Sequence, residues 1–216
     1  MIYVNGDGFA AASFANSKFS WSSQDENQSI RGFLIHPKNH EVSFGKTVSF
    51  LMHQPYRNDA YQFNSHLKIF RETYNIIEKE NVSHVIIVWP TIFNGEVFVD
   101  NQYHQFTFRY IDDIECNKKI KDSMFDQMRL FNTNTAYDDF ENKINDLCQT
   151  LNNKGIKHLM ISNHQMLPKG NANWLWENNT VRNWAKIENF INEDKFLTVN
   201  GHKSLAKLIL QNLTNQ

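Results

Sequence analysis

The chain begins MIYVNGDGFAAASF (residues 1–14), and this stretch decides the fold. Residues 2–4 are β-branched or aromatic, which is typical of a strand. The next four residues, NGDG, form turns readily, and the alanines after them favour a helix. In a parallel α/β sheet such a turn lies at the carboxyl end of its strand, where ligands bind and helix amides stabilise anions. We therefore expect this turn to lie at a functional site.

Strand and helix patterns alternate along the rest of the chain. Residues 58–79 carry apolar side chains at steps of three and four, which predicts a helix with one buried stripe. The run SHVIIVWP (83–90) predicts a buried strand that ends at Pro90, and IKHLMIS (156–162) predicts another. Alternating aromatic residues over 96–110 predict an inserted strand pair.

Two further helices follow from the same periodicity. Residues 135–154 repeat apolar side chains by three and four, with Thr135 and Asp138 placed as a capping box and Gly155 as a stop. A last helix begins near Gly201. Together the elements predict a three-layer α/β/α fold with a mostly parallel sheet and a β-hairpin insertion, in one domain of residues 1–216.

Composition and charge exclude several functional classes. The formal net charge is −1, so the chain lacks the basic surface of a nucleic-acid binder. Its longest apolar runs are too short to cross a bilayer, and its first residues lack the layout of a signal peptide. Cys116 and Cys148 are expected to be free thiols. The nine histidines are scattered, with His36 and His40 on either side of Pro37, so we expect no metal site and no cofactor.

Three segments, in order, resemble the SGNH (GDSL-type) hydrolases, most closely the SGNH-like proteins of tailed phages. NGDGFA (5–10) stands where that family has a Gly-Asp-Ser turn. VIIVWPTIFNGEVF (85–98) resembles the phage group's strand followed by an aromatic and polar loop. DKFLTVNGHKSLAKLIL (194–210) resembles the last block before the final helix. The resemblance spans nearly the whole chain and implies the SGNH fold, with flavodoxin-like topology.

The family's chemistry needs a serine nucleophile, a histidine base, an aspartate that orients the base, and oxyanion donors. By resemblance the serine position falls on Gly8 and the histidine position on Phe196, with Asp194 where the aspartate often lies. Asp7 is retained, and in the family it mainly holds the turn. The nucleophile and the base are thus both replaced by residues that lack their chemistry.

Other residues could replace the nucleophile, the base or the oxyanion donors, and each also has a possible structural role. Ser13 lies too far past Gly8 to present its hydroxyl at the turn. His202 is read as a helix residue that caps or packs, with a displaced general base as the alternative. Asn58 is an N-cap or an oxyanion donor, and Asn94 is a turn residue or the family's oxyanion asparagine. With these two asparagines, Trp89 completes the expected ligand-binding set.

Two clusters remain open to more than one interpretation. The stretch NWLWENNTVRNW (173–184) supplies tryptophans 174, 176 and 184, which either pack in the core or stack on a sugar or a protein partner. Core packing is favoured. The acidic pairs at 112–113 and 138–139 are read as solvated caps at the ends of elements.

The sequence therefore predicts a phage SGNH-like protein whose hydrolytic apparatus is depleted and which acts as a binding or virion-associated module. Its expected partners are other virion proteins or a glycan, with no nucleic acid and no membrane, and its expected location is the host cytoplasm or the virion. The alternative is an active esterase or carbohydrate O-deacylase with a displaced nucleophile, which requires a hydroxyl within hydrogen-bond reach of an imidazole.

Overall fold

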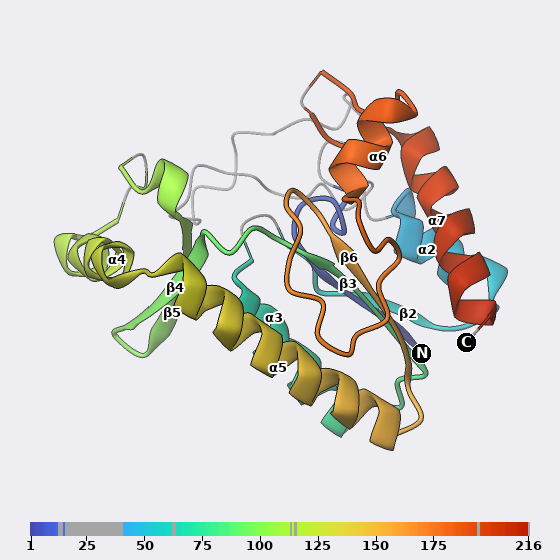
Figure 1. The fold of residues 1–216 in the computed structure, drawn as a ribbon, viewed down its shortest axis with the longest axis horizontal. Helices are drawn as coiled ribbons and strands as arrows, with labels where there is room; N and C mark the ends of the chain where they lie inside the picture. Colours follow the sequence, from blue (N-terminus) through green and yellow to red (C-terminus); the bar gives the residue numbers. More distant parts are fainter. Residues whose placement is uncertain are drawn as a thin grey trace.

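A computed structural model describes residues 1–12, 15, 41–61, 64–112, 114, 116–193 and 195–215. Its centre is a four-stranded sheet in the order β2-β1-β3-β6, and every neighbouring pair is parallel. Helices cover both faces of this sheet (Figure 1). The predicted three-layer parallel α/β fold is confirmed. The strands are β1 (Ile2–Gly6), β2 (Tyr56–Asn58), β3 (His84–Trp89) and β6 (Lys157–Ser162).

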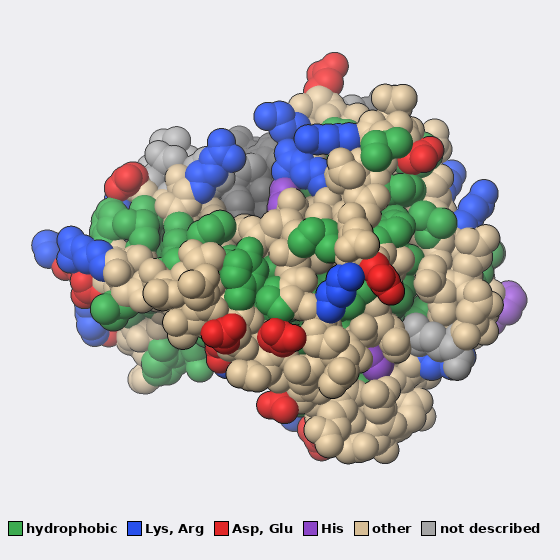
Figure 2. All heavy atoms as spheres, viewed as in Figure 1, with side chains coloured by type: hydrophobic (Ala, Val, Ile, Leu, Met, Phe, Trp, Pro, Cys, Tyr) green, Lys and Arg blue, Asp and Glu red, His purple; other side chains and the backbone are tan. Residues whose placement is uncertain are grey.

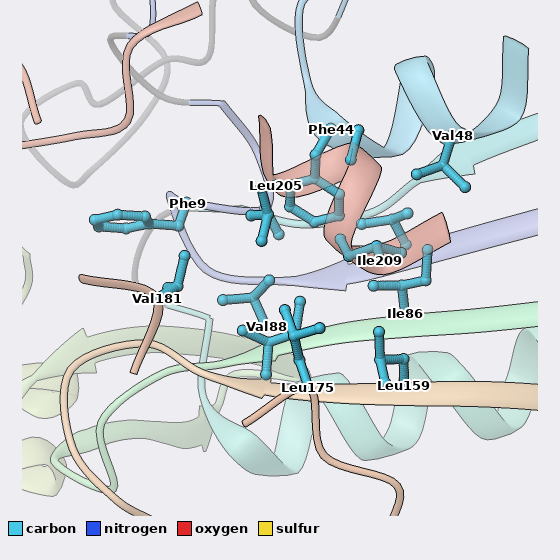
Figure 3. Close-up of a cluster of buried hydrophobic side chains, with 14 of the residues drawn as sticks. Phe9, Phe44, Val48, Ile86, Val88, Leu159, Leu175, Val181, Leu205 and Ile209 are labelled. Atoms are coloured by element: carbon cyan, nitrogen blue, oxygen red, sulfur yellow. The ribbon is translucent and has the colours of Figure 1, made fainter. Parts of the chain in front are cut away.

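One face of the sheet is covered by α2 (Phe44–Leu51), α6 (Val181–Ile187) and α7 (Val199–Thr214). Because side chains alternate across a strand, Ile2 and Val4 of β1 point to this face. Figure 3 shows Val88 of β3 and Leu205 of α7 among the buried side chains of this core. This packing explains the apolar stripe of the last helix.

The opposite face is covered by α3 (His66–Lys79) and α5 (Thr133–Asn153). Tyr3 of β1 and Trp89 of β3 point to this side and are fully buried. Since both faces are covered, β3 is apolar and buried from Val85 to Trp89, as the continuous run of 83–90 predicted.

The insertion is an antiparallel hairpin of β4 (Asn94–Val99) and β5 (Gln102–Thr107), which confirms the predicted strand pair. A short 3₁₀ turn, η2 (Phe108–Tyr110), and α4 (Lys118–Leu130) follow it, and α4 packs on β4. The buried Glu96 accepts two hydrogen bonds from Arg71 of α3, at 2.7 and 3.0 Å, and one from Gln105 at 2.6 Å. The guanidinium of Arg71 also lies 3.8 Å from the ring centre of Tyr103. These contacts fix the hairpin to α3.

Several predicted boundaries are wrong, and local hydrogen bonds explain why. The helix expected from residue 58 begins at His66, because Ser65 caps it by accepting from the amide of Lys68 at 3.0 Å. Asn58 instead ends β2, which the sequence analysis missed together with α2, α4 and α6. Phe63 of the expected stripe lies outside the described residues.

The expected capping box of the helix over 135–154 is also wrong. The helix begins at Thr133, and Asn132 caps it by accepting from the amide of Thr135 at 3.1 Å. Asp112, Asp138 and Asp139 are exposed as expected, but the last two lie within α5 and not at its cap. Asp113 lies outside the described residues.

At the two remaining helix starts the sequence prediction also differs from the structure. The last helix begins at Val199, slightly before the expected Gly201, because Thr198 is its cap. No helix follows β1 within the described residues: 8–12 form turns, and Ala12 has a φ of 56°, which an α-helix does not accommodate.

The two edges of the central sheet differ in how they end. β2 is three residues long and carries the charged Arg57. The other edge, β6, is covered by the segment 173–175. There the amide of Met160 donates to the carbonyl of Asn173 at 2.8 Å, and the amide of Leu175 donates to the carbonyl of Met160 at 2.9 Å. In the described part of the chain, no helix is long and apolar enough to cross a membrane.

Gly6 gives the first testable prediction, because it lies directly against β3. Its φ is +139°, and a Cβ built there would lie 2.3 Å from the carbonyl oxygen of Val88. We expect Gly6→Ala to lower the free energy of unfolding by about 3 kcal/mol or more, as measured by urea denaturation.

Gly155→Ala is the matched control for this substitution. Gly155 also has a positive φ, +66°, but no atom lies within 4 Å of a Cβ built on it. It should therefore cost only about 1–2 kcal/mol, the usual penalty of a left-handed residue. Equal losses in the two variants would show that the contact with Val88 does not constrain the turn.

Candidate functional site

The turn after β1 lies at the carboxyl edge of the sheet, next to the ends of β3 and β6. Gly6 closes onto β3, and the amide of Asp7 donates to the carbonyl of Val88 at 3.2 Å. The Asp7 carboxylate accepts from the amide of Phe9 at 3.0 Å, and its carbonyl accepts from the amide of Ala11 at 3.0 Å. Asp7 therefore holds the turn in place, which is the role that the resemblance implied.

Asp7 is also joined to the residue that follows β6. The side-chain amide of Asn163 donates to the second oxygen of the Asp7 carboxylate. Both side chains are buried, and the side-chain oxygen of Asn163 has no hydrogen-bond partner among the described residues. Burial raises the pKa of Asp7 to about 6, although the hydrogen bond from Asn163 and the charge of Arg182 act in the opposite direction.

A basic cluster lies beside this pair, made of His164, Arg182 and Lys186. His164 follows Asn163, and its Nδ1 lies 2.7 Å from a guanidinium nitrogen of Arg182 in α6. Since a guanidinium can only donate, Nδ1 is the acceptor. Part of the His164 ring reaches solvent, yet desolvation and the charges of Arg182 and Lys186 lower its pKa to about 4. Figure 2 shows a histidine among basic side chains on the side of α6. At neutral pH the cluster carries its positive charge on the arginine and the lysine.

Phe196 lies at the same edge, although it is far from the turn in sequence. Its ring centre is 5.7 Å from that of Phe9, the residue after Gly8, and the ring of His164 is 6.0 Å from Phe9 on a perpendicular plane. The structure thus brings the segments of Gly8 and Phe196 together. Asp194 and the candidate nucleophile Ser13 lie outside the described residues, as do His36 and His40.

His202 has a packing role, as expected for the favoured interpretation. It is fully buried in α7, its ring is stacked near Phe44, and its Nδ1 accepts from the amide of Phe44 at 3.3 Å. Its Nε2 is buried and has no hydrogen-bond partner in the part of the chain that the structure describes. Burial lowers the pKa of His202 to about 3, so the ring stays neutral.

The two expected asparagines have structural hydrogen bonds. Asn58 is not an N-cap: its side-chain amide donates to the carbonyl of Ala10 at 3.0 Å, and its oxygen accepts from the amide of Ala60 at 2.9 Å. It therefore ties β2 to the turn after β1. The side-chain amide of Asn94 donates to the carbonyl of Asn64 at 3.2 Å.

Asn64 itself reaches the turn. It is fully buried, and its amide donates to the carbonyl of Gly6 at 2.9 Å. The loops after β2 and β3 are thus linked to the loop after β1 through side-chain amides. Sequence reasoning did not single out Asn64, because an isolated asparagine in a loop has no distinguishing pattern.

The tryptophans pack. Trp89 is completely buried among Phe70 and Phe140, so its ring offers no open face for the expected ligand contact. Trp176 and Trp184 lie 5.5 Å apart between ring centres and pack partly buried against the α7 side of the core, as expected. The remaining tryptophan, at 174, packs against the opposite core.

Asn163, His164 and Arg182 were missed by the sequence analysis. A usable signal was present for the first two, since they directly follow a predicted buried strand, and parallel strands end at one edge. Arg182 had no comparable signal, because a single arginine in a Trp- and Asn-rich segment has no fixed position. Among the described residues, no group of three His, Cys, Asp or Glu side chains could hold a metal ion.

Neither a family model nor a curated protein sequence matches this chain. Its fold, in contrast, matches solved esterases. A carbohydrate esterase whose active site displays divergent catalytic and non-catalytic binding functions has a TM-score of 0.56 at 11% identity, covering 100% of this chain and 68% of that one.

Two further solved structures agree over nearly their full length. LAE5, an alpha/beta hydrolase from the metagenome of Lake Arreo, Spain, has a TM-score of 0.55 at 9% identity and covers 99% and 94% of the two chains. Esterase EstA from Pseudoalteromonas sp. has a TM-score of 0.52 at 10% identity and covers 99% and 96%. At such identities the similarity shows the fold alone, a parallel α/β fold that these esterases and this hydrolase share with the chain.

The raised pKa of Asp7 predicts how stability depends on pH. Between about pH 4 and 6 the folded chain holds the Asp7 proton more tightly than the unfolded chain, so this group's contribution to stability falls as pH rises. Asp7→Asn removes that charge, and its amide can pair with a rotated Asn163. We expect the unfolding free energy of the variant, relative to the unmodified protein, to rise by about 2–3 kcal/mol between pH 4 and 7.

Chemical denaturation at a series of pH values measures this difference. Asp139→Asn is the control, because Asp139 is exposed and its ion pair with Lys143 is solvated. Its difference curve should stay within about 0.5 kcal/mol. A flat curve for Asp7→Asn would contradict a carboxyl group that burial makes harder to ionise.

Proposed function

We propose that this chain is a catalytically depleted SGNH-type fold that serves as a binding module of a phage particle, with a glycan as its ligand. The observation that carries the proposal is the pairing at the turn: Gly8 offers no side chain, and the aromatic rings of Phe9 and Phe196 pack beside it. The order of sequence motifs, which resembles the phage SGNH-like group, supports the association with a virion.

The chemistry of ester hydrolysis explains why this pairing matters. An acyl transfer of the serine type needs a hydroxyl and an imidazole that takes its proton, and these groups act as one unit. The imidazole of His164 lies beside the turn, 6.0 Å from the ring of Phe9; its Nδ1 accepts from Arg182 and its pKa is about 4. A ring this weakly basic is poorly matched to proton abstraction near neutral pH.

The charge at the edge of the sheet favours an acidic ligand. Arg182 and Lys186 contribute two cations beside His164, and the charges of both act on its ring. Guanidinium groups bind carboxylates in a planar, two-pronged geometry. A glycan that carries carboxylates, such as a uronic-acid oligosaccharide, fits this chemistry. The esterase with non-catalytic binding functions offers a fold-level analogy only.

The first prediction of this proposal concerns catalysis. We expect no turnover of p-nitrophenyl acetate above that of Asp7→Ala and no labelling by a fluorophosphonate, because the hydroxyl and its base are both missing from the turn. General-base activation alone contributes about 10²- to 10⁴-fold in rate. Gly8→Ser and Phe196→His should each remain inactive, whereas the double variant should gain weak activity.

Mass spectrometry of the fluorophosphonate-treated protein checks this result. Stoichiometric labelling of one serine in the unmodified chain would instead support the active esterase with a displaced nucleophile.

The backbone permits the Gly8→Ser substitution. Gly8 does not have a positive φ, so a serine at this position needs no left-handed conformation.

The second prediction concerns binding. Titration calorimetry should give tighter binding for an oligogalacturonate than for a neutral xylo-oligosaccharide, and Arg182→Gln should weaken the former by about tenfold, the usual value of one charged hydrogen bond. Lys79 lies at the end of α3, near the start of β3 and thus at the opposite end of the strands. Lys79→Gln is therefore the charge-matched control and should leave the affinity unchanged. Equal effects of the two variants would refute the basic cluster as the ligand site.

A further inference from the structure

A pocket lies apart from the basic cluster, between α3, the start of β4, α4 and α5. Its volume is about 170 Å³. Neither the turn after β1 nor Phe196 contributes to its lining. It exists because the hairpin is fixed to α3 through Glu96 and Arg71 while α4 and α5 close around its base. The pocket is therefore built by the insertion.

The walls of this pocket are aromatic. Phe108 and Phe131 meet edge to face with ring centres 4.8 Å apart, and His66 lies 4.8 Å from Phe140. Phe70 adds a further ring. Flat, apolar walls of this kind favour a planar ring as ligand, since aromatic pairs prefer stacked or edge-to-face contacts.

Two polar atoms at the pocket can only accept hydrogen bonds. The side-chain oxygen of Gln127 is buried and has no partner in the described structure, a state that usually costs stability unless a ligand or water supplies a donor. His66 places its Nε2 3.1 Å from the carbonyl oxygen of Pro90, so Nε2 carries the hydrogen. Burial lowers the pKa of His66 to about 4, and its Nδ1 is then an acceptor at neutral pH.

Charge at the mouth disfavours an ionic ligand. Lys143 and Asp139, both in the lining, are paired with each other and so neutralise each other.

The space in the pocket suits one ring. Gly95 leaves room beside the unpaired side-chain oxygen of Gln127, because a Cβ at Gly95 would lie 3.1 Å from that oxygen. The available volume is close to that of an apolar cavity of about 150 Å³ that holds one benzene ring.

We propose that this pocket binds a small neutral phenol, with the ring between the aromatic walls and the hydroxyl donating to the side-chain oxygen of Gln127. A hydroxyl satisfies the unpaired acceptor, while a ring without a donor fills the same space and leaves that acceptor unpaired. The proposal is independent of the basic cluster and of the glycan.

Phenol and anisole are the probes that separate these cases, because methylation removes the donor and keeps the ring. Titration followed by amide shifts in NMR spectra should give phenol binding in the millimolar range, at least about fivefold tighter than anisole. Gln127→Met keeps the shape of the side chain and removes the acceptor, so the preference for phenol should fall below about twofold.

Filling the pocket supplies the second arm of the experiment. Ala136→Leu places a larger side chain from α5 into the lining and should abolish the binding of both probes, whereas Thr135→Leu, exposed on the same helix, should not. Equal affinity for phenol and anisole, retained binding in a folded Ala136→Leu variant, or no binding of phenol at tens of millimolar would each overturn the proposal.

Discussion

The close contact between Gly6 and the backbone of Val88 sets how the chain leaves the central sheet. Because no side chain stands between the two strands, the amide of Asp7 reaches the carbonyl of Val88 and the Asp7 carboxylate turns inward. From there Asp7 accepts from Asn163, so that the ends of three neighbouring strands are fixed relative to one another. The whole edge of the sheet depends on this absence of a side chain.

Buried and half-buried side-chain amides extend that constraint to the surrounding loops. Asn64 donates to the carbonyl of Gly6, Asn94 donates to the carbonyl of Asn64, and Asn58 donates to the carbonyl of Ala10. Buried polar groups of this kind are stabilising only when they are paired, and one hydrogen bond is worth about 1 kcal/mol net. Asn58 and Asn94, the two asparagines considered as oxyanion donors, here donate to the protein's own backbone.

Much of the architecture followed from the sequence because periodicity reports burial. The runs at 83–90 and 156–162 have continuous apolar centres, residues 85–89 and 159–161, and the structure buries these centres completely or almost completely between the two helix layers. The starts of helices were harder, since several Ser, Thr, Asn and Asp residues near each start are suited to cap it, and the sequence alone does not single out Ser65 and Asn132. β2 escaped notice because a three-residue edge strand is too short to show an alternation.

The candidate site was predicted less completely. The turn at Asp7 was located because its glycines and its position after a strand carry a local signal, and Phe196 was placed by the resemblance of residues 194–210 to the last block of the SGNH hydrolases. His164 and Arg182 meet only when β6 and α6 fold together, across a loop whose length the sequence does not relate to distance. A charge cluster whose members come from separate elements cannot be recognised from residues that are neighbours in the sequence.

The two edge strands of the central sheet, β2 and β6, also affect how copies of this protein can associate. An open strand edge is a template for pairing with another chain, and proteins suppress it with short strands, charges or covering segments. Here β2 is short and carries Arg57, while the segment at 173–175 occupies the backbone groups of Met160. The central sheet is thereby closed to extension from one molecule into the next. Packing of several copies in an ordered array would have to rely on side-chain surfaces of the helices and the hairpin.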